Sequence, residues 1–200
     1  MGAPESFGSE AENQGSTGLH KRQILSQNSG VCMEELVDGP MLHLGSGKRI
    51  WDKWMNVDFD ERADIQCDLK KLPFDDNYAD VAVSVHVIEH FYQWDVQDIL
   101  LEWKRVLKTG GKLVLELPCM DKVLNHMHHC MQNKLPIYPG MGWFVFWGDP
   151  RYKDPHMGHK WGYTKHMIQE ALESAGFRDV AFEEPRYHFK MRDMRVIGFK

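Results

Sequence analysis

The chain has 200 residues, of which 42% are hydrophobic and 26% charged, and its formal net charge is −5 at pH 7. These values are typical of a globular protein, and the negative charge argues against DNA or RNA as the main partner. The sequence holds no run of 18 apolar residues, no signal-peptide pattern and no C-x-x-C pair among its four cysteines. We therefore expect a cytoplasmic protein with reduced thiols and no membrane association, while the oligomeric state stays open.

The first 30 residues are rich in Gly, Ser, Glu, Gln and Asn and contain few apolar positions. Such a composition buries too little surface to offset chain entropy, so we expect residues 1–30 to form a flexible tail. A short helix over Val31–Val37 is expected to lead into a single domain that spans residues 31–200.

From Pro40 onward, short apolar runs alternate with patterns of helical periodicity. Strands are predicted at Met41–Leu44, Met55–Asp58, Ile65–Leu69, Val81–Val85, Lys112–Leu117, Val180–Glu183 and Met194–Phe199. Helices are predicted at Asp95–Lys108, capped by Asp95 and ended by Gly110-Gly111, and from the cap Thr164 to Gly176. This alternation predicts an α/β fold with a mostly parallel sheet, whose last two strands form an antiparallel hairpin at the edge.

Gly45-Ser46-Gly47 follows the first predicted strand directly, and Asp58 ends the second. Glycines at such a turn let the backbone approach a ligand, and a carboxylate after the second strand can accept hydrogen bonds from both ribose hydroxyls. The full G-x-G-x-x-G of dinucleotide folds is absent, because Ile50 occupies the third glycine position. Gly47 and Asp58 are also closer in sequence than the roughly 20 positions typical of such folds. The pattern therefore favours a ligand that has a ribose and no pyrophosphate.

The run HLGSGKRIWDKWMNVDFD, followed by ADIQCDLKKLPFDDNYADVAVSVHVIEHF, resembles the S-adenosylmethionine (SAM)-dependent methyltransferases of the type 11 group. It is similar in particular to a branch with a very short first crossover. The similarity is dense from residue 41 to 118, and the closing HKWGYT and LESAGF segments also resemble this family. The resemblance implies a Rossmann-like class I methyltransferase fold, SAM as the cofactor and methyl transfer as the reaction.

By that resemblance, Gly45 and Gly47 would pass beside the methionine part of SAM, and Asp58 would hold the ribose. Asp68 would accept from the adenine amino group, and His86, just past the fourth strand, would lie near the reacting methyl. The full set expected to contact the cofactor is His43, Gly45, Ser46, Gly47, Asp58, Phe59, Asp68, Leu69 and His86.

A hydroxyl acceptor also needs a base, and His86 and His90 are the nearest histidines by sequence. The alternative for His86 is that it lines the cofactor without moving a proton. His86, Glu89 and His90 would share one face of a helix, and some related methyltransferases bind a metal on an E-x-x-E-H motif at this place. Because His86 replaces the first Glu, and because E-H alone is common in members without metal, we expect no metal.

Residues 135–163 are crowded with proline, glycine and aromatic side chains. We interpret this segment as a lid that gives the acceptor apolar walls and excludes water; the alternative is a subdomain core or a dimer contact. The residues expected to meet the acceptor are Trp143, Arg151, Tyr152, His156 and His159.

The expected reaction is transfer of the SAM methyl group to an oxygen or nitrogen of a small-molecule or sugar acceptor. The N-P-P-Y motif of enzymes that methylate the amino groups of DNA bases is missing after the fourth predicted strand. Two alternatives keep the fold and the cofactor: a SAM-cleaving lyase, and a catalytically silent SAM-binding partner of another enzyme. The fold alone cannot separate these three.

Overall fold

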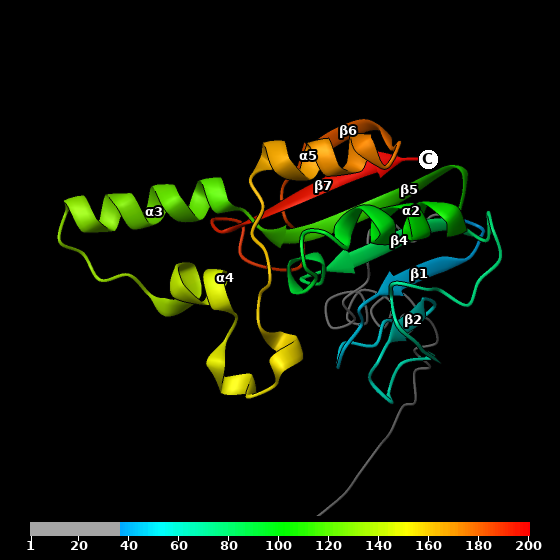
Figure 1. Ribbon diagram of the computed structural model, residues 1–200, viewed down its shortest axis with the longest axis horizontal. Helices are drawn as coiled ribbons and strands as arrows, with labels where there is room; N and C mark the ends of the chain where they lie inside the picture. Colours follow the sequence, from blue (N-terminus) through cyan, green and yellow to red (C-terminus); the bar gives the residue numbers. More distant parts are fainter. Residues whose placement is uncertain (1–36) are drawn as a thin grey trace, which may run out of the picture. The chain divides into compact units, whose positions relative to one another are not determined.

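The computed structural model describes residues 37–200 (Figure 1). The tail expected over residues 1–30, and the helix expected to follow it up to residue 36, lie outside the described residues. The described chain forms a seven-stranded sheet of order β3-β2-β1-β4-β5-β7-β6. The strands are β1 (Met41–Leu44), β2 (Met55–Asp58), β3 (Ile65–Gln66), β4 (Ala79–Val85), β5 (Leu107–Pro118), β6 (Arg178–Glu183) and β7 (Asp193–Phe199).

Strands β1 to β5 pair in parallel, whereas β7 runs antiparallel to both β5 and β6. The predicted mostly parallel sheet with an antiparallel C-terminal pair is therefore confirmed. Within this pair, β6 forms one edge of the sheet and β7 lies between β6 and β5. The burial of the two strands explains this: six of the seven residues of β7 are buried, while β6 exposes most of its side chains.

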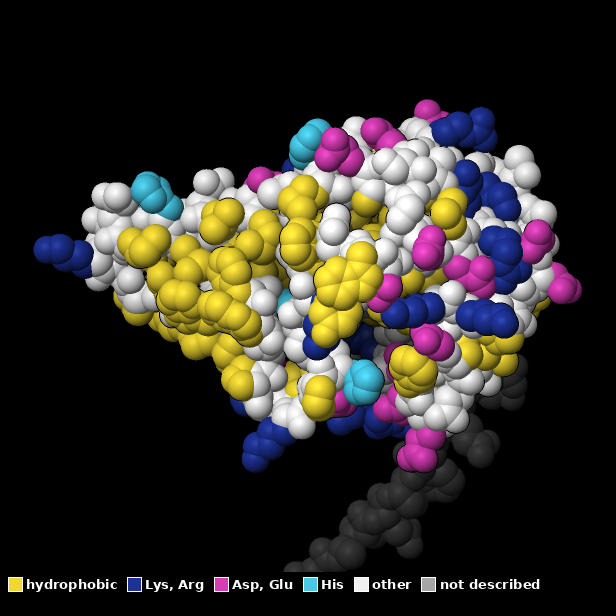
Figure 2. Space-filling model, in the orientation of Figure 1, with side chains coloured by type: hydrophobic (Ala, Val, Ile, Leu, Met, Phe, Trp, Pro, Cys, Tyr) yellow, Lys and Arg dark blue, Asp and Glu magenta, His cyan; other side chains and the backbone are white. Residues whose placement is uncertain are grey.

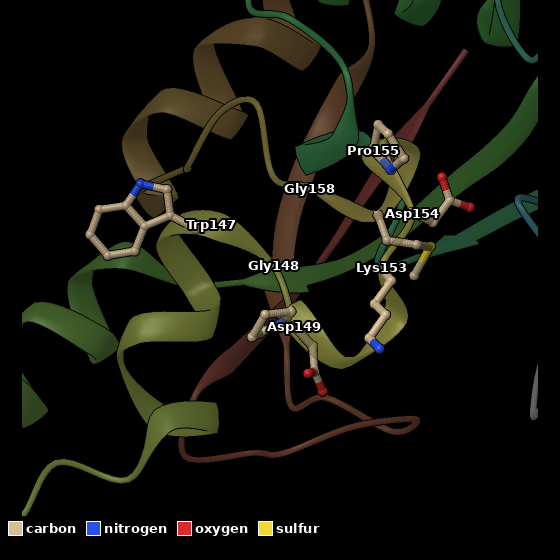
Figure 3. A pocket seen from close by; sticks show the side chains of 9 residues that line it. Trp147, Gly148, Asp149, Lys153, Asp154, Pro155 and Gly158 are labelled. Atoms are coloured by element: carbon tan, nitrogen blue, oxygen red, sulfur yellow. The ribbon is translucent and has the colours of Figure 1, made fainter.

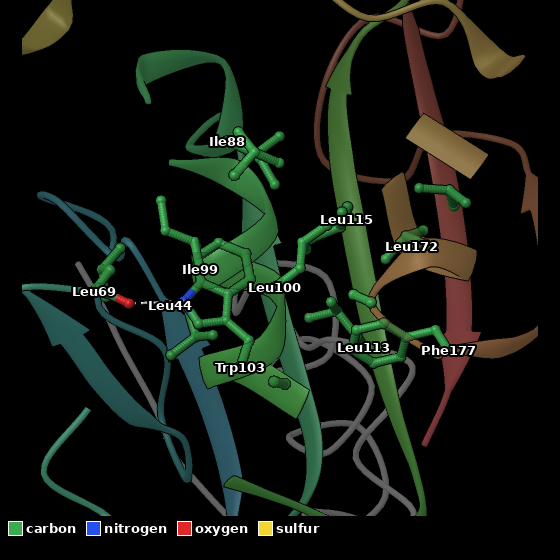
Figure 4. Close-up of a cluster of buried hydrophobic side chains, with 14 of the residues drawn as sticks. Leu44, Leu69, Ile88, Ile99, Leu100, Trp103, Leu113, Leu115, Leu172 and Phe177 are labelled. Atoms are coloured by element: carbon green, nitrogen blue, oxygen red, sulfur yellow. Dashed lines mark hydrogen bonds between the residues drawn. The ribbon is translucent and has the colours of Figure 1, made fainter. Parts of the chain in front are cut away.

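Two helices, α2 (Val96–Val106) and α5 (Lys165–Ser174), cover one face of the sheet (Figure 1). Their apolar stripes pack against the strands and form the main core (Figure 4). Trp103 is fully buried there, and its indole Nε1–H donates to the Leu69 carbonyl at 2.9 Å. This bond ties the connection after β3 to α2, and so holds the neighbouring Asp68 at the carboxyl edge of the sheet.

The end of α2 differs from the prediction. The helix ends at Val106, and Leu107 already belongs to β5, where it pairs with Ala79 of β4. Gly110-Gly111 therefore lie inside a strand and do not end the helix. Strand pairing, which local sequence does not reveal, decides this boundary.

The predicted caps have different outcomes. Thr164 caps α5, because its hydroxyl accepts from the Met167 amide at 3.2 Å. Asp95 occupies the N-cap position of α2, but its side chain makes no cap bond and pairs with Lys70 Nζ at 2.7 Å. The third strand also ends earlier than predicted, at Gln66.

Residues 119–163 form a lobe beyond the carboxyl ends of the parallel strands (Figure 1). It contains α3 (Met120–Gln132), α4 (Trp143–Trp147) and the short 3₁₀ helices η2 (Pro139–Met141), η3 (Pro150–Tyr152) and η4 (Pro155–Met157). Val123 and Met127 of α3 pack against Val145 of α4 in a small core. Val145 of the segment 135–163 thus contributes to a small core with α3, and the interpretation of the segment as a lid stays a prediction.

The outer surface of this lobe is apolar, as Figure 2 shows. Its exposed large hydrophobic side chains include Leu124, Met131, Leu135, Tyr138, Trp143 and Trp147. Among the helices of residues 37–200, none is long and apolar enough to cross a membrane.

Candidate active site

The turn after β1 brings both predicted glycines against the end of β2. The Gly45 amide donates to the Val57 carbonyl at 2.8 Å, and the Gly47 amide donates to Asp58 Oδ2 at 2.7 Å. Both glycines have positive φ, 78° and 51°, a conformation that favours glycine. No described atom lies within 4 Å of the place a Gly47 Cβ would take, so the space beside this turn is open.

Gly45 also contacts the segment that follows β4. A Cβ at Gly45 would stand 2.2 Å from Val87 Cγ2, so only glycine allows this close approach. Val87 precedes the 3₁₀ helix η1 (Ile88–His90), and His86 before it has a positive φ of 55°. The glycine turn and the polar segment 86–90 are therefore direct neighbours at the carboxyl edge of the sheet.

Two predicted carboxylates flank this turn. The oxygens of Asp58 each accept one backbone N–H, from Gly47 at 2.7 Å and from Asp60 at 2.9 Å. Because an ionised carboxylate offers about four lone-pair sites, both oxygens can accept further donors. Asp68 is exposed, and its Oδ1 accepts from the Lys70 amide at 2.9 Å.

The other predicted cofactor residues differ in exposure. His43 is buried in β1, where its ring stacks on Trp51 at 3.7 Å and its Nδ1 lies 3.1 Å from Asn56 Oδ1. Burial lowers the pKa of His43 to about 4, against the opposing effect of Asn56. Ser46 is buried as well, whereas Phe59 is exposed after β2. His43 is thus a neutral, packed side chain of the sheet.

His86 lies between two buried carboxylates. Its Nδ1 is 3.0 Å from Glu89 Oε1, and its Nε2 is 3.0 Å from Asp193 Oδ2. Asp193 also accepts from the Arg192 guanidinium at 2.6 and 2.9 Å, and the ring of His188 lies 4.2 Å from that of His86. Burial lowers the pKa of His86, but Glu89 and Asp193 outweigh burial and raise it to about 9. His86 is therefore a cation at neutral pH.

The His86 cation shifts the groups around it. Burial raises the pKa of Glu89 and of Asp193, but the interaction with His86 outweighs burial and holds both at about 2. Burial, together with the His86 charge, lowers the pKa of His188 to about 4. At neutral pH the His86 cation thus lies between the Glu89 and Asp193 anions, beside the neutral imidazole of His188.

A second cluster joins η1 to the lobe. Ligand atoms of Glu89, His90 and His159, one from each side chain, lie within 4.8 Å of one another. The rings of His90 and His159 meet edge to face, with 4.8 Å between their centroids. The lobe's backbone reaches the same place, because the Lys160 amide donates to the Glu89 carbonyl at 2.8 Å. The predicted catalytic residue His90 and the predicted acceptor residue His159 thus lie close together.

The remaining predicted acceptor residues lie on the surface of the lobe. They are Trp143, Arg151, Tyr152 and His156. The ring of His156 lies 6.4 Å from that of Phe59, so the lobe approaches the end of β2. A pocket of about 280 Å³ opens between Trp147 and Gly158, with Lys153 and Asp154 in its lining (Figure 3). None of the five predicted acceptor residues belongs to this lining.

Sequence reasoning missed Asp193, His188 and Tyr163 as members of this region. Asp193 stands directly before the apolar run of β7. Because β7 is antiparallel to its neighbours, its first residue lies at the carboxyl edge of the parallel strands. A charged residue at the start of such a strand was the available signal. The positions of His188 and Tyr163 follow from no local pattern.

Solved structures of low sequence identity share this fold. A possible histamine N-methyltransferase from Thermotoga maritima is 18% identical, with 91% of this chain and 95% of that chain covered and a TM-score of 0.56. A SAM-dependent methyltransferase from Archaeoglobus fulgidus is also 18% identical, with coverage of 94% and 96% and a TM-score of 0.56. One from Methanosarcina mazei is 17% identical, with coverage of 82% and 92% and a TM-score of 0.57. No curated protein sequence matches the chain.

The family comparison adds a match in sequence to the likeness in fold. Residues 44–115 match the type 11 family model described as a methyltransferase domain. This stretch runs from the end of β1 into β5, and it contains the glycine turn, Asp58, Asp68 and the polar segment 86–90. Residues 44–115 thus match a type 11 methyltransferase domain, and the described chain has the class I, Rossmann-like fold of solved SAM-dependent methyltransferases.

Proposed function

We propose that this chain is a SAM-dependent methyltransferase that acts on an oxygen or nitrogen of a small-molecule or sugar acceptor. The observation that carries this proposal is the contact of Gly45 with Val87, which puts the cofactor turn directly beside the polar segment 86–90. A polar acceptor next to that segment finds hydrogen-bonding partners close to the place where a methyl group is delivered. The acceptor lies, in this proposal, between the carboxyl edge of the sheet and the lobe.

The residues at the glycine turn fit SAM. The open space beside Gly47 leaves room for the methionine part, and the free lone pairs of Asp58 suit the ribose hydroxyls. Asp68 keeps acceptor capacity for the adenine amino group. When bound, SAM supplies a methyl group that its sulfonium has already activated, so the protein mainly aligns the acceptor and excludes water.

His86 and His90 differ in the roles that we propose for them. His86 already carries its proton between Glu89 and Asp193, so it serves as a fixed positive charge and not as a base. His90 Nδ1 lies 3.3 Å from the Gly158 carbonyl. Because a carbonyl can only accept a hydrogen bond, Nδ1 of the neutral His90 ring carries the hydrogen and Nε2 carries the lone pair. In methyl transfer to O–H or N–H, the S–CH₃ bond breaks, the new bond to the acceptor forms, and the proton leaves the acceptor. In this proposal, His90 accepts that proton.

Calorimetric titration with SAM and S-adenosylhomocysteine tests the cofactor site. We expect saturable binding by the wild-type protein and its loss in Asp58→Ala. Asp52→Ala is the matched control, because Asp52 is an exposed acid of the same crossover and should leave binding unchanged. Equal binding by Asp58→Ala and the control would refute the assignment of Asp58.

Product analysis then tests the reaction class. Incubation with SAM and a panel of hydroxyl- and amine-bearing small molecules and sugars should yield S-adenosylhomocysteine only when an acceptor is present. Breakdown of SAM without any acceptor would indicate a lyase. Tight SAM binding without turnover across the panel would indicate a silent partner protein.

A further inference from the structure

We propose that Arg49 and His188 form a binding site for an oxyanion, the carboxylate or phosphate group of an acidic methyl acceptor. Arg49 belongs to the glycine turn, because its amide donates to the Ser46 carbonyl at 2.9 Å. The space beside Gly47 on the same turn is open. His188 lies on the loop between β6 and β7. The inference rests on the proposed function for the place of the acceptor, and it narrows the acceptor to molecules with a negative charge.

The loop that carries His188 has a fixed place next to the glycine turn. The fully buried carboxylate of Glu116 accepts from three successive loop amides at 2.8 Å, those of residues 186–188. The ring of Tyr187 lies 4.9 Å from that of Trp51, which follows the glycine turn in the sequence. The loop and the turn are therefore neighbours, and the position of His188 is set by backbone hydrogen bonds.

His188 offers a hydrogen-bond donor at this place. Arg192 Nη2 lies 3.4 Å from Nδ1 of His188. Because a guanidinium can only donate, Nδ1 of the neutral ring accepts and Nε2 carries the hydrogen. Within residues 37–200 this Nε2 has no hydrogen-bonding partner, and the side chain is 32% exposed. A ligand can therefore accept a hydrogen bond from it.

Arg49 supplies a positive charge that no neighbour compensates. The cations of His86 and Arg192 each pair with a buried carboxylate. The guanidinium of Arg49 is exposed and has neither an ion pair nor a hydrogen bond among the described residues. Burial is the main cause of the low pKa of His188, about 4, and the charges of His86, Arg192 and Arg49 lower it further, against the effect of Asp193. A free guanidinium and a neutral N–H donor are the partners that an oxyanion requires.

An acidic acceptor fits the position of this pair. The ring of His188 lies 4.2 Å from that of His86, the residue expected near the reacting methyl. Bound SAM adds its positive sulfonium to the same edge of the sheet, which attracts an anionic acceptor further. The methionine carboxylate of the cofactor has the same chemistry as the proposed ligand. The two sources differ in one respect: the carboxylate of the cofactor would fill the site in the S-adenosylhomocysteine complex, whereas an acceptor group would leave it free.

NMR titration with inorganic phosphate at constant ionic strength tests the site, with the backbone amides of Gly47 and His188 as reporters. Protein saturated with S-adenosylhomocysteine should show saturable shifts of both signals. Arg49→Gln should weaken phosphate binding by about 10-fold or more, because a charge-assisted contact is lost. His188→Phe keeps a ring beside His86 but removes the N–H, and should weaken binding by roughly 3-fold. Arg178→Gln is the matched control and should bind like the wild type, because Arg178 is exposed at the start of β6, at the amino edge of the sheet.

Three results would overturn the oxyanion site: no shift of either amide signal, unchanged binding by Arg49→Gln, or equal weakening by Arg178→Gln. The source of the anion is tested with 5′-methylthioadenosine, which lacks the methionine carboxylate. Phosphate binding in that complex but not in the S-adenosylhomocysteine complex would assign the site to the cofactor and refute the acidic acceptor. Methyl transfer to neutral members of the acceptor panel alone would also refute it. If S-adenosylhomocysteine does not bind at all, the proposed function fails, while phosphate titration of the free protein still tests Arg49 and His188.

Discussion

The buried imidazole of His43 should make the protein less stable at mildly acidic pH. Its pKa is about 4 in the folded protein and 6.5 in the unfolded chain, because burial and, more weakly, Arg49 disfavour the cation. Between these values the unfolded state binds more protons, so the free energy of unfolding falls as pH falls from 6.5 toward 4. Over the range from pH 7.5 to 5.0, this one group costs about 2 kcal/mol of stability.

Urea denaturation at the two pH values, followed by tryptophan fluorescence, measures this effect. His43→Gln removes the titration while an amide can still reach Asn56, so its stability should depend on pH less than that of the wild type by about 2 kcal/mol. The test compares how much the free energy of unfolding changes between the two pH values in each protein. A loss of stability in the variant that is the same at both pH values therefore does not affect the result. If the two proteins lose the same stability on acidification, His43 is not held neutral by the fold.

Three further substitutions test the packing that positions the site. Gly45→Ala should destabilise the fold by at least about 1 kcal/mol and weaken SAM binding, because φ is positive at this position and the new Cβ clashes with Val87. Adding Val87→Ala should recover part of the lost stability. No recovery would refute the clash. Trp103→Phe should lower the free energy of unfolding in urea by about 1–3 kcal/mol, because the buried Leu69 carbonyl loses its donor; an unchanged midpoint would contradict this. Thr164→Ala should cost about 1 kcal/mol in the same assay, and Thr164→Ser should restore most of it if the hydroxyl is the cap.

The first half of the sheet could be predicted from local sequence. β1 and β2 have the predicted bounds because their apolar residues stand directly before the glycine turn and Asp58. The end of α2 could not be predicted in this way. Gly110-Gly111 signals a helix end locally, but Leu107 gains a partner in Ala79, and that long-range pairing starts the strand four residues after Trp103.

Helix α3 shows how a strong chemical pattern can conceal a structural one. No helix was predicted over Met120–Gln132, where His126, His128 and His129 stand beside an apolar stripe that includes Val123 and Met127. In the structure, His128 and His129 are exposed and belong to neither histidine cluster of the candidate site. The histidine that does meet the site, His159, comes from a loop with no periodicity, so its place depends on the tertiary fold alone.

The candidate site is assembled mainly by the backbone. Gly45 fits against Val87 because it has no side chain, and the Lys160 amide holds the lobe to the Glu89 carbonyl. These two contacts join three segments that are distant in the sequence: the glycine turn, η1 and the lobe. Neither contact depends on a flexible side chain. Because methyl transfer requires in-line alignment of donor and acceptor, this rigidity is the main contribution that the protein has to make. Changes to the exposed aromatic residues of the lobe should therefore alter which acceptor fits, whereas changes to Gly45 should slow transfer to every acceptor.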